Sequence, residues 1–183
     1  GSYGSSATFS GLVAGTYTVG IKDNNNCTST VSVTVGQPSS ALSASSTQVN
    51  VTCNGLGDGS ITLTPTGGTT AYSYSWTGPG TYTSTKQSPS SLIAGTYSYT
   101  ITDSKGCTSS GSVTIKEPTL LSVSKSSVTD VDCYGGSSGS ITVSGSGGTT
   151  PYSYNISGGS YGSSATFSGL VAGTYTVGIK DNN

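Results

Sequence analysis

Four cysteines are the residues of this sequence best suited to covalent chemistry. Cys53 and Cys133 end the strings Val-Thr-Cys and Val-Asp-Cys, whereas Cys27 and Cys107 stand in the polar strings Asn-Asn-Asn-Cys and Ser-Lys-Gly-Cys. In a secreted chain, two cysteines in each repeated unit indicate disulfides rather than free thiols. Their spacings of 26, 54 and 26 residues include no C-x₂₋₄-C pair, so we expect no structural zinc site.

Other catalytic groups are sparse. The sequence has no histidine, which excludes Ser–His and Cys–His nucleophiles within these 183 residues. Asp130 and Asp132 are close together, but no further spaced acids accompany them as a calcium loop requires. We therefore expect no catalytic residue, no metal, no cofactor and no enzymatic activity. The seven carboxylates are scattered, mostly over predicted turns: Asp23, Asp58, Asp103, Glu117, Asp130, Asp132 and Asp181.

The chain is periodic, and the period defines its units. Residues 1–25 return unchanged as residues 159–183, a period of 158 residues. Residues 12–38 also align with residues 92–118 at an offset of 80, so two related units alternate within the period. We expect the chain to be a window cut from a longer array. Pro38 and Pro118 close the units, which gives the C-terminal half of one unit (1–38), a complete unit (39–118) and a unit without its last strand (119–183).

Apolar residues alternate with Ser and Thr throughout the complete unit. Ile61 and Leu63 follow this rule, as do Val113 and Ile115, and Gly-rich turns separate the runs. Such alternation is typical of half-buried antiparallel strands and is not expected of a disordered chain, although apolar content is only 31%. About seven strands in 80 residues predict an all-β fold of tandem immunoglobulin-like β-sandwiches. At roughly 40 Å per unit, such an array forms an elongated rod.

The aromatic residues have two readings. Tyr72, Tyr74 and Trp76 share one face of a predicted strand, where they form either a sugar-stacking platform or part of the core. The next unit has Ile156 in place of Trp76, which preserves burial but removes stacking, so we expect a core role. The predicted core aromatics are Tyr72, Tyr74, Trp76, Tyr97, Tyr152, Tyr154 and Tyr175.

Charge excludes several classes of partner. The net charge is −1, with no basic patch, so we expect no nucleic-acid partner. No run approaches 18 apolar residues, so we expect no membrane insertion in this segment. The remaining candidate partners are neighbouring identical repeats of the same chain, surface polysaccharide and other filaments.

Several motifs together resemble the SprB repeat. They are a Cys-x-Gly opening (53–55 and 133–135), a Gly-Gly-x-x-[Pro/Ala]-Tyr-x-Tyr turn and strand (67–74 and 147–154), an Ala-Gly-Thr-Tyr strand start (94–97 and 172–175) and an Asp-x-x-x-Cys close (103–107). The resemblance implies a very large, extracellular cell-surface protein of Bacteroidota, of the kind that gliding cells move along their surface and export by type IX secretion. The expected function is therefore a structural and adhesive stalk. The alternatives are an array of carbohydrate-binding modules and the non-catalytic spacer of a large secreted enzyme.

The pairing of the cysteines depends on strand direction. A bridge between Cys53 and Cys107 closes a 54-residue loop, for which the chain-entropy model gives about 4 kcal/mol. If the first and last strands of a unit run in the same direction, however, these residues lie roughly 30 Å apart, whereas a disulfide tolerates about 7 Å between Cα atoms. The alternative is a staple from Cys53 to the hairpin cysteine of the next unit, expected at position 185. Free thiols are the third possibility.

Overall fold

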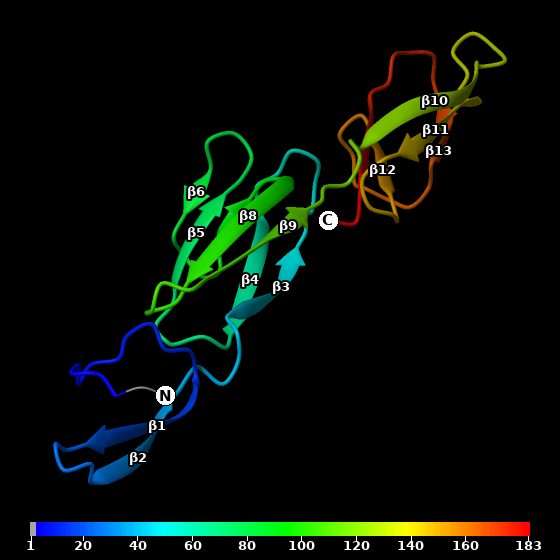
Figure 1. Ribbon diagram of the computed structural model, residues 1–183. Coiled ribbons are helices and arrows are strands. Elements are labelled where there is room, and N and C mark those ends of the chain that lie inside the picture. Colours follow the sequence, from blue (N-terminus) through cyan, green and yellow to red (C-terminus); the bar gives the residue numbers. More distant parts are fainter. Residues whose placement is uncertain (1–2) are drawn as a thin grey trace.

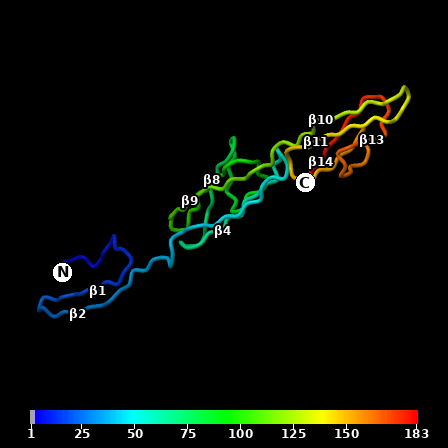
Figure 2. Tube along the Cα trace, turned by 90° about the vertical axis from the view of Figure 1, so that its right-hand side faces the viewer, coloured from blue at the N-terminus to red at the C-terminus, as the bar shows by residue number. Residues whose placement is uncertain are grey.

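The computed structural model describes residues 3–183, which form strands and loops without a helix. Every strand pairing among them is antiparallel, so the all-β prediction is confirmed. The alternation of apolar residues with Ser and Thr suits pleated strands that are buried on one face. The strands lie in three groups arranged in line, and both views show a long, narrow molecule (Figures 1 and 2).

The middle group is a two-sheet sandwich. Its smaller sheet has the order β3-β4-β7, with β3 at Ser43–Val49, β4 at Gly59–Thr66 and β7 at Ser90–Leu92. Its larger sheet has the order β6-β5-β8-β9, with β6 at Thr83–Ser84, β5 at Ser73–Thr77, β8 at Gly95–Thr102 and β9 at Thr108–Ile115. Seven strands in two antiparallel sheets agree with the β-sandwich expected from the strand count.

The third group repeats most of this plan. One of its sheets has the order β10-β11-β13, formed by β10 at Ser122–Thr129, β11 at Gly139–Ser146 and β13 at Thr166–Leu170. The other pairs β12, at Ser153–Ile156, with β14, at Val177–Lys180. The first group is the hairpin of β1, at Gly15–Lys22, and β2, at Thr28–Val35.

The core lies between the two sheets of the middle group. Leu63 on β4 and Ile101 on β8 are fully buried, and the indole Nε1 of Trp76 on β5 donates to the Lys86 carbonyl at 2.8 Å. In the first hairpin no second sheet covers the corresponding face. Val33 is therefore 48% exposed, whereas its equivalent Val113 on β9 is 6% exposed.

The first and last strands of the middle group run in the same direction and meet at one end. The N–H of Val51, just after β3, donates to the carbonyl of Lys116, just after β9, at 3.1 Å. Cys53 therefore lies at the end of the unit where β9 finishes, whereas Cys107 precedes the start of β9. An eight-residue strand between them spans roughly 26 Å.

The cysteine prediction needs a correction for this reason. All four cysteines, which lie within residues 3–183, are free thiols in the structure. A bridge between Cys53 and Cys107 within one unit is wrong, because the parallel course of the two strands separates their ends by several times the reach of a disulfide.

Candidate functional site at the junction between units

Each unit has two ends, and the sequence motifs gather there. We call the end at which the chain enters the unit the entry end. In the middle unit it comprises residues 40–42, the loop 67–72 and the hairpin loop 103–107. We call the opposite end, formed by the loop 50–58 and the linker 116–118, the exit end.

Asp103 holds the entry end together. Its Oδ1 accepts the N–H groups of Lys105 and Cys107, both at 2.9 Å, and its Oδ2 accepts the N–H of Thr69 at 2.9 Å. The side chain thus links the hairpin loop to the loop 67–72 while the residue is only 5% exposed. The hydrogen bond from Thr69 is the main cause of a lowered pKa at Asp103, and burial opposes it. Asp181 accepts the Thr149 N–H at 2.9 Å in the same way in the third unit.

Two glycines make the loop 67–72 possible. Gly67 and Gly68 have φ angles of +71° and +62°, a region that residues with a side chain seldom adopt. A side chain at Gly67 would also collide with the carbonyl of Ala41, and one at Gly68 with the carboxylate of Asp103. The hydroxyl of Tyr72 then donates to the Gly67 carbonyl at 2.7 Å. The two glycines of the Gly-Gly-x-x-[Pro/Ala]-Tyr motif therefore leave the space that the entry segment at Ala41 and the side chain of Asp103 occupy.

At the exit end, loop 50–58 is hydrogen-bonded to the linker that leads to the next unit. The loop 50–58 and the linker are joined by polar contacts that involve backbone and side chains from both. These are Lys116 N–H to Asn50 Oδ1 at 2.9 Å, Gly55 N–H to Glu117 Oε2 at 2.7 Å and Asn54 Nδ2 to the Pro118 carbonyl at 3.1 Å.

A second carboxylate orders the loop itself. Asp58 accepts the hydroxyl of Thr52 at 2.6 Å and its N–H at 3.1 Å. The hydroxyl contact is the main cause of a lowered pKa at Asp58. The loop that carries Cys53 is thus closed between Thr52 and Asp58.

Asn183 connects the two units directly. Its Nδ2 donates to the Thr52 carbonyl of the middle unit at 2.8 Å and to the Thr149 hydroxyl of its own unit at 2.9 Å. Figure 1 shows the C-terminal residue lying between the middle and third groups, beside the exit end of the middle unit. One asparagine side chain therefore joins the entry end of the third unit to the exit end of the middle unit.

The structure places the four cysteines at unit ends. Cys53 lies in the exit-end loop of the middle unit and Cys133 in the equivalent loop of the third unit, while Cys27 and Cys107 lie in entry-end hairpins. Cys53 is half-buried, and the other three are exposed.

The predicted core aromatics differ in burial. Trp76 and Tyr97 are 1% exposed and Tyr154 is 8% exposed, while Tyr72, Tyr74, Tyr152 and Tyr175 are half-buried. Trp76 packs against Tyr99 with their ring centroids 5.2 Å apart. Because the indole is enclosed, Trp76 offers no open face for a sugar ring.

Sequence reasoning missed a second role of the Ala-Gly-Thr-Tyr motif. The Tyr97 hydroxyl donates to the Ile93 carbonyl at 3.0 Å, which closes the corner that leads into β8. Tyr17 and Tyr175 make the same contact with Val13 and Val171. This tyrosine corner is a feature of immunoglobulin-like sandwiches. The sequence did carry a signal for this corner. In each Leu-[Ile/Val]-Ala-Gly-Thr-Tyr string, the tyrosine follows the Ile or Val by four residues.

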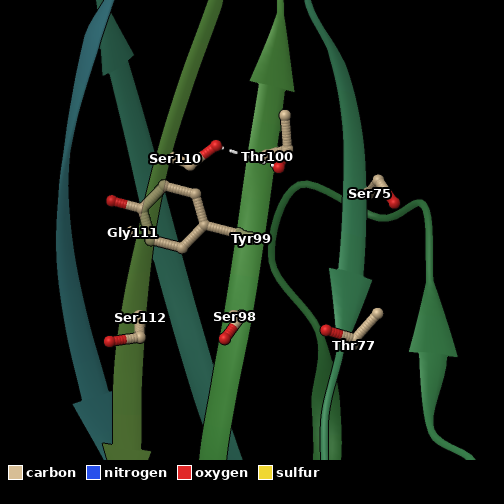
Figure 3. A pocket seen from close by; sticks show the side chains of 8 residues that line it. All are labelled: Ser75, Thr77, Ser98, Tyr99, Thr100, Ser110, Gly111 and Ser112. Carbon is tan, nitrogen blue, oxygen red and sulfur yellow. Dashed lines mark hydrogen bonds between the residues drawn. The ribbon is translucent and has the colours of Figure 1, made fainter.

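The outer face of the larger sheet carries hydroxyl groups. Figure 3 shows Ser and Thr side chains of β5, β8 and β9 around a shallow depression, with the Tyr99 ring lying across Gly111. The hydroxyls of Thr100 and Ser110 are hydrogen-bonded across the two strands at 3.0 Å. The residues that line the depression are serines, threonines, Tyr99 and Gly111, so the polar side-chain groups that it presents are hydroxyls.

Residues 3–183 contain neither a cluster of metal ligands nor a helix that could span a membrane. No three His, Cys, Asp or Glu side chains lie close enough there to hold a metal ion. The same residues include no helix with the length and apolar character needed to cross a membrane.

Comparison with protein families places two segments of the chain in a known repeat family. The model of the SprB repeat matches residues 45–81 and residues 125–160. Each match begins in the first strand of a unit, passes through the Cys-x-Gly loop and continues beyond the Gly-Gly turn, so both junction motifs lie inside it. No curated protein matches the chain.

Proposed function

Because the chain carries two SprB repeats, we propose that it is a length of the stalk of a large bacterial cell-surface adhesin. In this proposal the stalk is extracellular and acts mechanically, without catalysis or a cofactor. Its units set the distance between the cell and the binding tip. We further propose that the adhesin serves gliding or attachment and reaches the surface by type IX secretion, as the repeat family suggests.

The junction is the observation that carries the proposal. Loop 50–58 of the middle unit binds the linker, and its Thr52 carbonyl accepts the side chain of Asn183 from the next unit. A linker that is hydrogen-bonded along its length has lost the freedom of a flexible tether. Each junction therefore fixes the orientation of one unit relative to the next, as a straight stalk requires.

No observation favours the two alternatives. A carbohydrate-binding array would present an open aromatic row, but Trp76 is 1% exposed and its indole N–H is engaged by Lys86. An enzyme spacer requires no fixed junction, since a flexible tether serves that role equally well.

Electron microscopy of lengthened chains tests the proposal. Chains with one, two and three copies of the 158-residue period are imaged in reducing buffer, with contour length as the readout. We expect straight particles that gain roughly 80 Å per copy, which is two units of roughly 40 Å. A matched control carries a Gly-Ser insertion after Pro118 in every copy and should bend at each insertion. Wild-type particles that are compact, or as bent as the control, would refute the stalk.

A further inference from the structure

The two ends of the chain are complementary to each other. We propose that one copy binds a second copy by strand exchange, in which β2 of one molecule leaves β1 and pairs with β14 in the third unit of the other. This contact lies between chains, so the inference holds whether or not the stalk proposal does.

One eight-residue string occurs twice, once with a strand beside it and once without. Gly-Thr-Tyr-Thr-Val-Gly-Ile-Lys forms residues 15–22 and again residues 173–180. Paired with β2, the first copy is strand throughout, as β1, whereas in the third unit only Val177–Lys180 is strand, as β14. β14 pairs with β12, and no strand within residues 3–183 pairs with its other edge. Since the two strings are identical, the difference lies in their neighbours, and the open edge is a template for another strand.

The third unit also has a groove at the place that β9 fills in the middle unit. Ile115 on β9 is 1% exposed, and its Cγ2 lies so close to Gly59 that an added Cβ would be 2.9 Å from it. The equivalent glycine of the third unit, Gly139, lines a groove of about 230 Å³ instead. The groove is therefore the position that a last strand would occupy.

The apolar walls of this groove are less buried than their equivalents in the complete unit. Val131, Ile141 and Leu170 line the groove, and all three are half-buried. Their equivalents in the middle unit belong to the same core cluster as Ile115 and are at most 3% exposed: Val51, Ile61 and Leu92. A last strand would remove this apolar surface from water, which favours its binding.

Strand β2 meets the requirements for that last strand. Residues 12–38 align with residues 92–118, so β2 corresponds to β9, and it pairs with β1 in the register that β9 has with β8. Val33 on β2 is 48% exposed in the hairpin, whereas Val113 at the same place on β9 is 6% exposed. Because residues 173–180 repeat β1, β2 can make the same backbone hydrogen bonds with them. The exchange thus retains the strand pairing and gains apolar burial.

The exchange joins copies end to end. Figures 1 and 2 show the first hairpin and the third group at opposite ends of the molecule, so β2 does not reach β14 of its own chain. Residues 36–38 follow β2 as the linker 116–118 follows β9. The middle unit of one copy would therefore follow the completed third unit of the other. Such a head-to-tail contact leaves a free β2 at one end and a free groove at the other, which gives open chains of copies.

Sedimentation velocity tests the exchange. The chain is refolded from urea at increasing protein concentration in reducing buffer, and the mass distribution is measured. We expect the mass to rise from the monomer through a series of its multiples. An excess of a peptide of residues 28–38 should occupy the groove and return the distribution to the monomer. The same peptide with Val33→Asp and Val35→Asp is the control and should have no effect.

Two variants of the full chain carry the same new charge on opposite faces of β2. Val33→Asp should abolish association, because it places a carboxylate against the apolar groove. Ser32→Asp is the matched control, since Ser32 is exposed and its equivalent Ser112 is exposed in the complete middle unit, so association should persist. Trp76 fluorescence confirms that the middle unit of each variant has folded.

A lengthened chain closes the test. Its own residues 26–38, added after Asn183, supply the third unit with a last strand from the same molecule, so we expect this chain to stay monomeric. Monomers of the original chain at every concentration would overturn the proposal. Oligomers that persist with the peptide, with Val33→Asp or in the lengthened chain would also overturn it, because another surface would then hold the copies together.

Discussion

At the scale of single residues, the units depend on a few side chains that hydrogen-bond to the backbone of distant loops. Asp103 joins two loops that are 34 residues apart in sequence, and Tyr97 closes a corner four residues before it. Because buried N–H and C=O groups are costly to leave unpaired, each such side chain stabilises a loop that has no sheet partners of its own.

The tyrosine corner can be tested by removing one oxygen. Tyr97→Phe leaves the Ile93 carbonyl without its partner while it preserves the ring, so we expect the middle unit to lose about 1–2 kcal/mol of unfolding free energy. Urea unfolding followed by the fluorescence of Trp76, the single tryptophan, reports on this unit alone. Tyr82→Phe is the matched control, since the Tyr82 ring packs against Tyr97 but its hydroxyl makes no hydrogen bond within residues 3–183. Equal losses for both variants would contradict the account.

The hydrogen bonds that the Asp103 carboxylate accepts predict that the stability of the middle unit falls in acid. The pKa of Asp103 is lower in the folded protein than its unfolded value of about 3.9, because the ionised carboxylate accepts the Thr69 N–H. The stabilisation is therefore complete above the unfolded pKa and is lost as pH falls through the folded pKa. Asp103→Asn should destabilise the unit at pH 7, and this deficit should shrink as the pH is lowered toward 2, as Trp76 fluorescence in urea can measure. A deficit that stays constant between these pH values would show that the charge plays no part.

At the scale of elements, the strands could be predicted from sequence but the loops could not. Alternation places Leu63 and Ile101 inside, because a strand turns successive side chains to opposite faces. The loops at the two ends have no such period. Asn50, Asn54 and Asn183 look like ordinary polar turn residues in the sequence, and their partners across the junction depend on the tertiary arrangement.

The cysteines show the same division. The direction of the first and last strands follows from the sandwich fold, and it rules out the Cys53–Cys107 bridge. The contact of the Asn183 side chain with the Thr52 carbonyl, by contrast, emerges only from the structure.

A pair of substitutions on neighbouring strands tests which side chains of this sheet face the core and which face solvent. Leu63 on β4 is fully buried, so Leu63→Ala should cost about 2–5 kcal/mol through lost transfer energy and the cavity it leaves. Val49 on β3 is 60% exposed, so Val49→Ala should change stability by about 0.5 kcal/mol or less. Urea unfolding monitored at Trp76 measures both. Similar costs for the two variants would mean that the register of this sheet is wrong.

At the scale of the whole molecule, the contacts at the exit end of one unit set the orientation of the next unit. Both views show the three groups in line, and hydrogen bonds from the middle unit hold the linker at the second junction (Figures 1 and 2). Asn54→Ala with Asn183→Ala removes two side-chain contacts of this junction while the core of each unit stays intact. We expect the double variant to keep the urea midpoint at Trp76 within error but to broaden the angle between units in particle images. An unchanged angle would show that other contacts set the direction.

The measurement that tests the central claim most directly is the distance between units in solution. Each of the four native cysteines is replaced by Ser, and spin labels are attached at Ser112→Cys on β9 and Ser124→Cys on β10, both exposed positions. Pulsed dipolar spectroscopy then gives the distance distribution across the junction. The account predicts one narrow peak that broadens in the Asn54→Ala, Asn183→Ala variant. A broad distribution in the chain with both asparagines intact would contradict it, because the units would then be beads on a flexible string.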